Sequence, residues 1–323
     1  MVTPTWCGLE QWLSQRRRNV KAPVKHHYVP QFLLRNFADA KEQLVVHRLD
    51  QSGSFPAVVL KTGHRNDGHT LYGPSFDGGK DRTTLESMMS GLEAKAALVI
   101  SELASPAGAS ELSEEHRHVL RWFAGLQTAR SRFTFGYISR QAEQEGGPIG
   151  LTREETQTGL LMASTRSHLD AWMASKDPDS HYKDRYSPFG SELMAFRWDL
   201  VRFKQPSLVV SDAFAAQSGI RVEQRHKYHP VQKNWAKHGI GVPLNESARV
   251  TMALTPTLGV YLHRGTTKKA LKAEAFNRDS VYAAREFVAH APGWESSKPL
   301  LSKSMAGNLD LQRMLRVAMA KNF

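Results

Sequence analysis

SEEHRHVLRWFAGLQTARSRFTFGY, residues 113–137, is the stretch that decides the fold, because it predicts a long helix with one apolar face. Ser113 begins this helix, and Glu114 and Glu115 in the first turn complement the helix dipole. We expect the helix to run to about Arg140. Apolar side chains recur every three or four residues, as they do on a buried helix face: Val119, Phe123, Leu126, Phe133 and Tyr137.

Arg130 lies in the middle of this apolar face. A guanidinium keeps its charge and is costly to bury unpaired, so the fold must supply carboxylates, backbone carbonyls or a bound anion. Three interpretations follow: a buried salt bridge that fixes helix packing, an arginine lining a pocket for an anionic ligand, or an exposed helix edge.

Two more amphipathic helices are expected beside this one, so that residues 81–176 form a helical zone. The third helix begins at Thr152, whose spacing to Glu155 fits a capping box, and it continues through Leu160, Leu161, Leu169 and Trp172. The first helix has its apolar positions at Leu85, Met88, Met89, Leu92, Ala96, Val99 and Leu103.

Strands are predicted on both sides of the helical zone. Two predicted strands, Gln43–Leu49 and Ala57–Lys61, precede a polar, glycine-rich stretch at 63–81 that predicts a loop. We expect closing helices at about Asp279–His290 and Leu309–Ala320. The predicted C-terminal strands are FRWDLVRF (196–203), LVVSD (208–212), ARVTMALT (248–255) and LGVYLHR (258–264).

These elements predict an α+β protein that forms a single domain over residues 1–323. Its centre is a bundle of about three long helices, flanked by an N-terminal β-hairpin and a C-terminal antiparallel sheet that pack on the helices. The zones are 1–80 (mixed), 81–176 (helical) and 177–323 (strands and terminal helices).

The chain is strongly basic, with 43 Lys and Arg against 31 Asp and Glu and a formal net charge of +12. Such an excess favours phosphate-rich partners through electrostatic steering and counterion release, so we expect nucleic acid or a nucleotide as partner. A generally basic solubility surface, an anionic membrane surface or a protein partner remain alternatives.

The single cysteine, Cys7, excludes an internal disulfide framework and a zinc site built on several thiolates. The spacing of His226, His229 and His238 matches no zinc signature either. The N-terminal residues lack the apolar core of a secretory signal, and no segment approaches the roughly eighteen apolar residues of a membrane span. We therefore expect a cytoplasmic protein.

The segment KHHYVPQFLLRNFA, residues 25–38, places two histidines and an arginine among apolar residues. Pro30 is suited to the first turn of a helix, so His26 and His27 lie just before its N-terminus, where backbone N–H groups favour an anion. These imidazoles contact a phosphate or transfer a proton, or else they are a cap and a surface residue.

Three carboxylates are further candidates. Glu86 and Glu93 lie two turns apart on one face, separated by about 10 Å of axial rise, so we prefer them as salt-bridge partners of Arg130 over ligands of one hard cation. Asp212 ends a buried strand, where a carboxylate lines a cleft or caps a turn.

A basic arm precedes the histidines and is a candidate surface for nucleic acid. Such runs are most often solvated, and the same residues suit contacts with a phosphate backbone. The arm consists of Arg16, Arg17, Arg18, Lys21 and Lys25.

HHYVPQFLLRNF, residues 26–37, closely resembles the first motif of the bacterial proteins catalogued as the domain of unknown function 4238 family. TLESMMSGLE, WFAGLQTARSR, LVVSD and a later VPL segment agree more loosely, and the resemblance spans about residues 25–290. The family's strand motif usually continues Ser-Asp-Asn-Pro, whereas Ala213 and Phe214 follow Ser211-Asp212 here. The first motif maps onto His27, Tyr28, Pro30, Leu34, Arg35, Asn36 and Phe37.

The resemblance implies one polar set within one architecture, without implying a reaction. That set is His27, Arg35, Glu86, Glu93, Arg130 and Asp212.

The first functional hypothesis is an enzyme that hydrolyses phosphodiester bonds in nucleic acid or nucleotides, of the host-defence or toxin type. His27, with His26 beside it, acts as general base or acid, and Arg35 and Arg130 stabilise phosphate charge. The carboxylates Glu86, Glu93 or Asp212 orient histidine or hold Mg²⁺ as a cofactor.

The second hypothesis is a non-enzymatic module that binds nucleic acid or a protein through its basic surface. In that module the same polar residues are structural.

Overall fold

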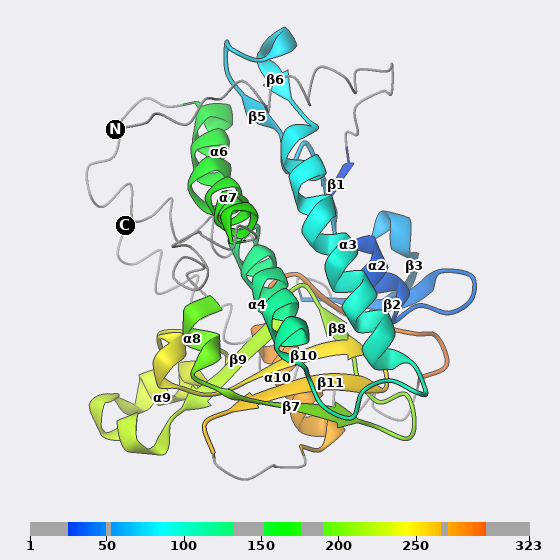
Figure 1. The fold of residues 1–323 in the computed structure, drawn as a ribbon, viewed down its shortest axis with the longest axis vertical. Coiled ribbons are helices and arrows are strands. Elements are labelled where there is room, and N and C mark those ends of the chain that lie inside the picture. Colours follow the sequence, from blue (N-terminus) through cyan, green and yellow to red (C-terminus); the bar gives the residue numbers. More distant parts are fainter. Residues whose placement is uncertain (1–24, 50–52, 132–151, 176–189, 266–270, 295–323) are drawn as a thin grey trace.

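The computed structural model describes residues 25–49, 53–131, 152–175, 190–265 and 271–294. Within these ranges the protein is mixed α+β, as the sequence predicts, with strands near the N-terminus and antiparallel sheets in the C-terminal half. Figure 1 shows long helices on one side of a four-stranded sheet. No helix in the described ranges combines the length and the hydropathy needed to span a membrane.

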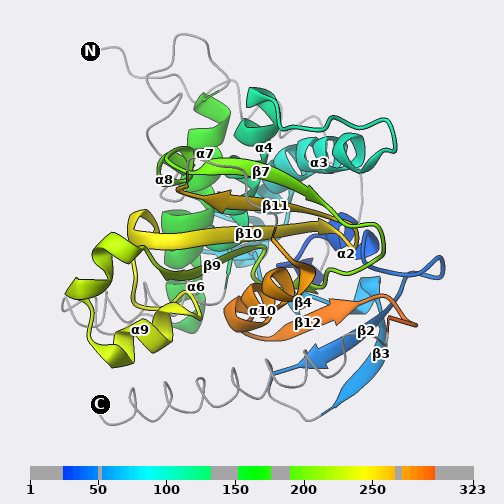
Figure 2. The ribbon, with the colours of Figure 1, turned by 90° about the horizontal axis from the view of Figure 1, so that it is seen from below.

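The larger sheet has the strand order β7-β11-β10-β9, and every neighbouring pair is antiparallel. All six residues of β11 are buried, because helices cover both faces of the sheet (Figure 2). The helix α10 packs closely on β11: a Cβ added at Gly259 would lie 2.6 Å from the ring of Phe276. The bounds are β7 (Arg197–Arg202), β9 (Ala215–Ile220), β10 (Ser247–Thr255), β11 (Leu258–His263) and α10 (Ala273–Ala283).

The second sheet joins the two ends of the described chain, with the order β3-β2-β12-β8. The predicted N-terminal hairpin is present as β2 and β3, but it ends at Val58, and Val59–Lys61 forms a 3-10 turn instead of strand. Because β2 pairs with β12, the N-terminal and C-terminal zones share one sheet. The bounds are β2 (Gln43–Arg48), β3 (Ser54–Val58), β8 (Val210–Ser211) and β12 (Phe287–His290).

The prediction of a helix over Asp279–His290 is wrong in its second half. The helix α10 stops at Ala283, Ala284 has an extended conformation with ψ 145°, and residues 287–290 form β12. All four residues of β12 are buried between β2 and β8, so sheet hydrogen bonds and burial outweigh the local helical pattern. The predicted helix at Leu309–Ala320 lies outside the described residues.

Helices α3 and α4 are antiparallel neighbours, and α4 also packs on α7 (Figure 1). The first predicted helix is confirmed, and so are the cap at Ser113 and the capping box of Thr152 and Glu155. A π turn at Met162–Arg166 separates α6 from α7. The bounds are α3 (Thr84–Ala104), α4 (Glu114–Ala129), α6 (Arg153–Leu161) and α7 (Ser167–Ala174).

The helix expected to run to about Arg140 ends at Ala129, and Arg130 lies in the turn that follows, with φ −92° and ψ 2°. Phe133 and Tyr137 lie outside the described residues. A central bundle of three long helices is therefore not confirmed, although the α+β class is.

The start of α3 and the end of α4 lie away from the larger sheet, beside a small two-stranded ladder of β1 and β4. A separate apolar cluster that includes Leu85, Met89, Trp122 and Trp172 packs there. The remaining elements are β1 (Lys25–His27), α2 (Gln31–Arg35), β4 (His64–Asn66), β5 (Leu71–Tyr72), β6 (Lys80–Asp81), α8 (Gly190–Met194), α9 (Pro230–Ala236) and 3-10 turns at Asp77–Gly79, Val222–Lys227 and Leu244–Glu246.

His168 in α7 makes the stability of this cluster depend on pH. Its Nε2 lies 2.9 Å from the carbonyl oxygen of Trp122, and burial lowers its pKa from 6.5 to about 4, although that hydrogen bond opposes the change. The folded state therefore keeps His168 neutral while the unfolded state takes up a proton as the pH falls below 6.5.

We predict that wild type loses up to about 3 kcal/mol of unfolding free energy at His168 as the pH falls from 6.5 to about 4. His168→Gln removes the titrating group, so this variant should lose less stability over that window. Urea unfolding at several pH values measures the difference. The exposed His226→Gln is the control and should keep the wild-type slope. Parallel slopes for wild type and His168→Gln would contradict the prediction.

Candidate functional site

The candidate site lies where the β1–β4 ladder meets the first turn of α3 and the end of α4. The ladder pairs His26 with Arg65 and His27 with His64, and alternation along β1 sends His26 and His27 to opposite faces. After β4 the chain turns at Asp67, whose φ is 53° and whose carbonyl accepts a hydrogen bond from the backbone N–H of Thr70. This turn brings His69 next to His26.

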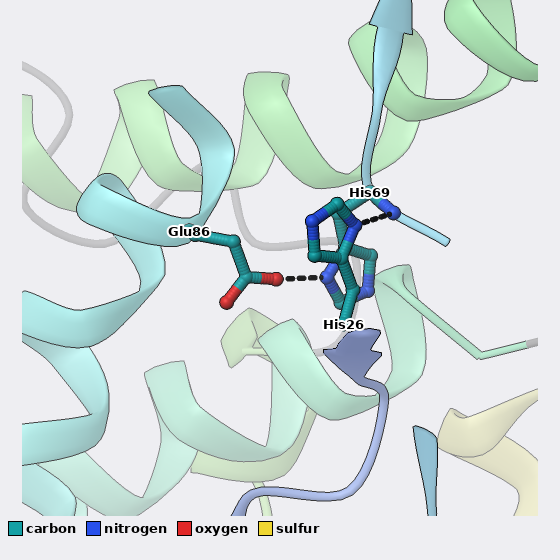
Figure 3. A group of neighbouring side chains, drawn as sticks. All are labelled: His26, His69 and Glu86. Atoms are coloured by element: carbon teal, nitrogen blue, oxygen red, sulfur yellow. Dashed lines mark hydrogen bonds and ion pairs between the residues drawn. The ribbon is translucent and has the colours of Figure 1, made fainter. Parts of the chain in front are cut away.

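His26, His69 and Glu86 form a compact group, here called the His–Glu cluster (Figure 3). The backbone N–H of His69 donates to Nδ1 of His26 at 2.8 Å, and the two rings stack with centroids 5.6 Å apart. Oε1 of Glu86 lies 2.6 Å from Nδ1 of His69. Since a carboxylate accepts, Nδ1 of His69 carries the shared proton and its Nε2 keeps a lone pair.

The electrostatics of the cluster keep Glu86 charged. Burial alone would raise the pKa of Glu86, but the hydrogen bond and charge of His69, with the charges of His26 and Arg130, outweigh it and the pKa is lowered. Burial also lowers the pKa of His69, against the opposing effect of Glu86. A carboxylate that orients a neutral imidazole is an arrangement suited to accepting a proton or binding a cation.

Arg130 is buried beside this cluster, and among the described residues only one of its three guanidinium nitrogens has a hydrogen-bond partner. Nη1 donates to Oε1 of Glu93 at 2.7 Å and contacts Sδ of Met89 at 3.4 Å. Nε and Nη2 are buried and have no hydrogen-bond partner among the described residues. The side chain is 1% exposed, so these two donor groups are buried in a position where a hydrogen-bond acceptor should satisfy each of them.

The contacts of Arg130 match part of what the sequence predicts. The buried salt bridge is present, with Glu93 as partner, while Glu86 pairs with His69. Burial raises the pKa of Glu93, although the charge of Arg130 opposes this change. The expectation that both carboxylates pair with Arg130 is therefore confirmed for Glu93, whereas the ion pair of Glu86 is with His69.

His27 lies next to the cluster without joining it. Its Nδ1 is 3.3 Å from Nε2 of Gln31, and its ring meets the ring of His64 edge-on at 5.5 Å between centroids. Burial, with the charge of His64, lowers the pKa of His27 to about 4, against the opposing effects of the Leu60 carbonyl and Glu86. His27 is therefore neutral at neutral pH.

Arg35 and Asp212 make their described contacts elsewhere. Arg35 is exposed and bonds to Glu42 and Gln31. Asp212 accepts from the backbone N–H groups of Arg285 and Glu286, at 3.0 and 3.1 Å, which makes it a cap between β8 and β12. Burial raises the pKa of Asp212 to about 6, although these N–H groups oppose the change.

Most residues of the predicted nucleic-acid surface lie outside the described residues. Lys25 is exposed on β1, and the four arginine and lysine residues of the arm at 16–21 lie outside the described residues. His226 and His229 are exposed and His238 is buried against Tyr282, with rings 4.2 Å apart. None of these three belongs to a candidate metal group in the described part of the chain.

Sequence reasoning missed His69 and His64, because both lie in the glycine-rich stretch that predicts a loop. The presence of two histidines in this polar stretch is the single local signal. Their position depends on the pairing of β4 with β1, which lie almost 40 residues apart in the chain and share no short-range pattern.

Residues 25–292 match a protein family described as "Protein of unknown function (DUF4238)". This range includes the His–Glu cluster, Arg130 and both sheets. Among curated proteins and among solved structures, no match to the chain was found.

The buried pair of Arg130 and Glu93 should contribute more to stability than an exposed pair with nearly the same distance. Glu93→Ala leaves a buried guanidinium without its carboxylate, so we predict a loss of about 3–5 kcal/mol in unfolding free energy. Glu42→Ala removes the partner of Arg35, whose side chain is 47% exposed, and should cost at most about 1 kcal/mol. Chemical denaturation measures both, and equal losses would contradict this difference.

Proposed function

The chain belongs to the DUF4238 family, whose description states no activity, and from its site we propose that it hydrolyses phosphodiester bonds in nucleic acid or nucleotides. The observation that carries this proposal is the buried guanidinium of Arg130 beside the His–Glu cluster, which has two of its three nitrogens without a partner among the described residues. Nε and Nη2 of Arg130 offer N–H donors that are already desolvated, and a phosphate oxygen is the acceptor that such a fork suits best.

The roles of the residues follow from their contacts. Arg130 donates to the non-bridging phosphate oxygens and stabilises the charge that develops on them. The His–Glu cluster activates the attacking water, which adds to phosphorus while the bond to the leaving oxygen breaks. The His–Glu cluster accepts the proton that the water loses, and the leaving oxygen takes up one proton, so the reaction causes no net change in the number of protons on the enzyme. Glu93 holds Arg130 in place.

His27 and the overall charge support the proposal in different ways. Because His27 is neutral and lies near Glu86 and Arg130, it can hydrogen-bond to a bound phosphate ester without adding charge. The net charge of +12 favours the approach of a polyanion, and exposed Lys25 lies on the same strand as His26.

A direct test is cleavage of single- and double-stranded DNA and RNA, and of cyclic and linear nucleotides, with Mg²⁺ or Mn²⁺ present. We predict that Arg130→Lys lowers kcat by about 10²–10³, because the ammonium cannot reproduce the fork of donors. His69→Gln and Glu86→Gln should lower it by about 10²–10⁴. His27→Ala tests the contribution of the neighbouring histidine.

The controls are Arg35→Gln and His226→Gln, which change exposed residues of the same types and should keep wild-type rates. Circular dichroism and thermal unfolding establish that each variant is folded. If wild type leaves every substrate intact, or if the site variants cleave as fast as wild type, the proposed hydrolase is wrong.

A binding module is the second candidate, and the ion pair of Arg130 with Glu93 is the observation that favours it, because a structural role explains this contact without a ligand. In this case nucleic acid or a protein binds to the basic surface. Affinity for nucleic acid should then fall steeply with salt, and the variants Arg130→Lys and His27→Ala should bind as tightly as wild type.

A further inference from the structure

We propose that His26, His69 and Glu86 bind a divalent transition-metal ion. The binding itself is independent of the proposed hydrolase, and only the catalytic role of the ion rests on that function. The three side chains come from β1, from the turn after β4 and from the first turn of α3 (Figure 3).

The geometry of the cluster is close to that of a metal site. One donor atom from each of the three side chains lies within 4.8 Å of the other two. In a site with metal–ligand bonds of about 2.0–2.2 Å and tetrahedral angles, donor atoms are about 3.4 Å apart. Nδ1 of His69 and Oε1 of Glu86, at 2.6 Å, are already closer than this because they share a proton.

The donor types select the class of cation. Two imidazoles and one carboxylate suit Zn²⁺, Mn²⁺ or Fe²⁺, whereas Mg²⁺ and Ca²⁺ prefer oxygen ligands throughout. Three protein ligands leave at least one coordination position open, as in catalytic zinc sites with two histidines and a glutamate. Burial of His26 and His69 limits competition by water for the ligands.

Binding requires local changes in the cluster. The ion takes the place of the proton between Nδ1 of His69 and Glu86, and that proton moves to Nε2 of His69, so the neutral imidazole releases no net proton. Nδ1 of His26 accepts the backbone N–H of His69, so ligation through Nδ1 would replace this hydrogen bond, whereas ligation through Nε2 would keep it. These changes are small ring and carboxylate movements within side chains that already touch.

The ion gives the cluster a defined role in the proposed reaction. A water bound in the open position has a lowered pKa and attacks phosphorus as hydroxide. Arg130 pairs with Glu93, which lies two turns after Glu86 on α3, so its remaining donors can hold the phosphate next to that water. Glu93 offsets the repulsion between Arg130 and the ion.

The test is metal binding by the full chain after treatment with a chelator. Zn²⁺ is the probe, with Mg²⁺ as comparison, and the readouts are isothermal titration calorimetry and metal content after dialysis. We expect about one Zn²⁺ per chain, little net release of protons at neutral pH because His69 is already neutral and Glu86 already charged, and no stoichiometric binding of Mg²⁺. Glu86→Gln and His69→Gln should each weaken Zn²⁺ binding at least 10-fold. The double variant His226→Gln/His229→Gln, in exposed histidines, should bind as wild type does.

X-ray absorption of the zinc-loaded wild-type protein keeps the test independent of how well the variants fold. Two imidazole ligands with oxygen ligands support the proposal. Absence of stoichiometric binding, thiolate coordination, or unchanged affinity in folded Glu86→Gln overturns it. Stoichiometric Zn²⁺ binding without cleavage of any substrate refutes the hydrolase and leaves the metal site intact, whereas cleavage at the full rate in chelator refutes the catalytic role of the ion.

Discussion

The buried guanidinium of Arg130 is the constraint on which this end of the molecule depends. Its charge cannot be removed by deprotonation, so a carboxylate must lie within reach wherever the chain places it. Glu93 meets this need from the third turn of α3, which fixes how α3 and α4 align as antiparallel neighbours. Glu86 lies two turns earlier on the same helix, so α3 carries both the partner of Arg130 and the carboxylate that contacts His69.

The parts of this site that the sequence predicts are those encoded by helical periodicity. Arg130 is out of place on an apolar face, and Glu93 is at the right border of the neighbouring helix, so both burial and partner follow from local patterns. The prediction holds even though α4 ends at Ala129, because a residue one position past the helix still projects near the same face. His69 has no such pattern. Its position depends on the three-residue ladder between β1 and β4, which pairs residues far apart in the chain and leaves no periodic signal in the sequence. The helix expected over residues 287–290 fails for the same reason, since pairing with β2 and β8 determines β12.

The segment HHYVPQFLLRNF, residues 26–37, serves mainly to attach the N-terminal part of the chain to the rest of the fold. Leu34 and Phe37 are fully buried, and the amide of Asn36 donates to the carbonyl of Leu254 in β10. Tyr28 donates to Glu286 at 2.6 Å, and the resulting burial beside a carboxylate raises the pKa of its hydroxyl. Asp212 attaches the same region by accepting the backbone N–H of Glu286. A strong sequence signature is therefore compatible with a structural role for most of its residues, and the histidines are the members that reach the candidate site.

Glu286 connects the second sheet to the candidate site through contacts that no local pattern reveals. It pairs with Arg65 of β4 as well as with Tyr28 of the motif, and Arg65 also lies over the Tyr28 ring. Arg65 is the residue opposite His26 in the β1–β4 ladder, so the position of this ladder depends on a carboxylate just before β12. Because the ladder has only three residue pairs, its own hydrogen bonds are too few to hold two histidines against α3. The second sheet therefore supports the candidate site, although among the described residues it contributes no side chain to the His–Glu cluster.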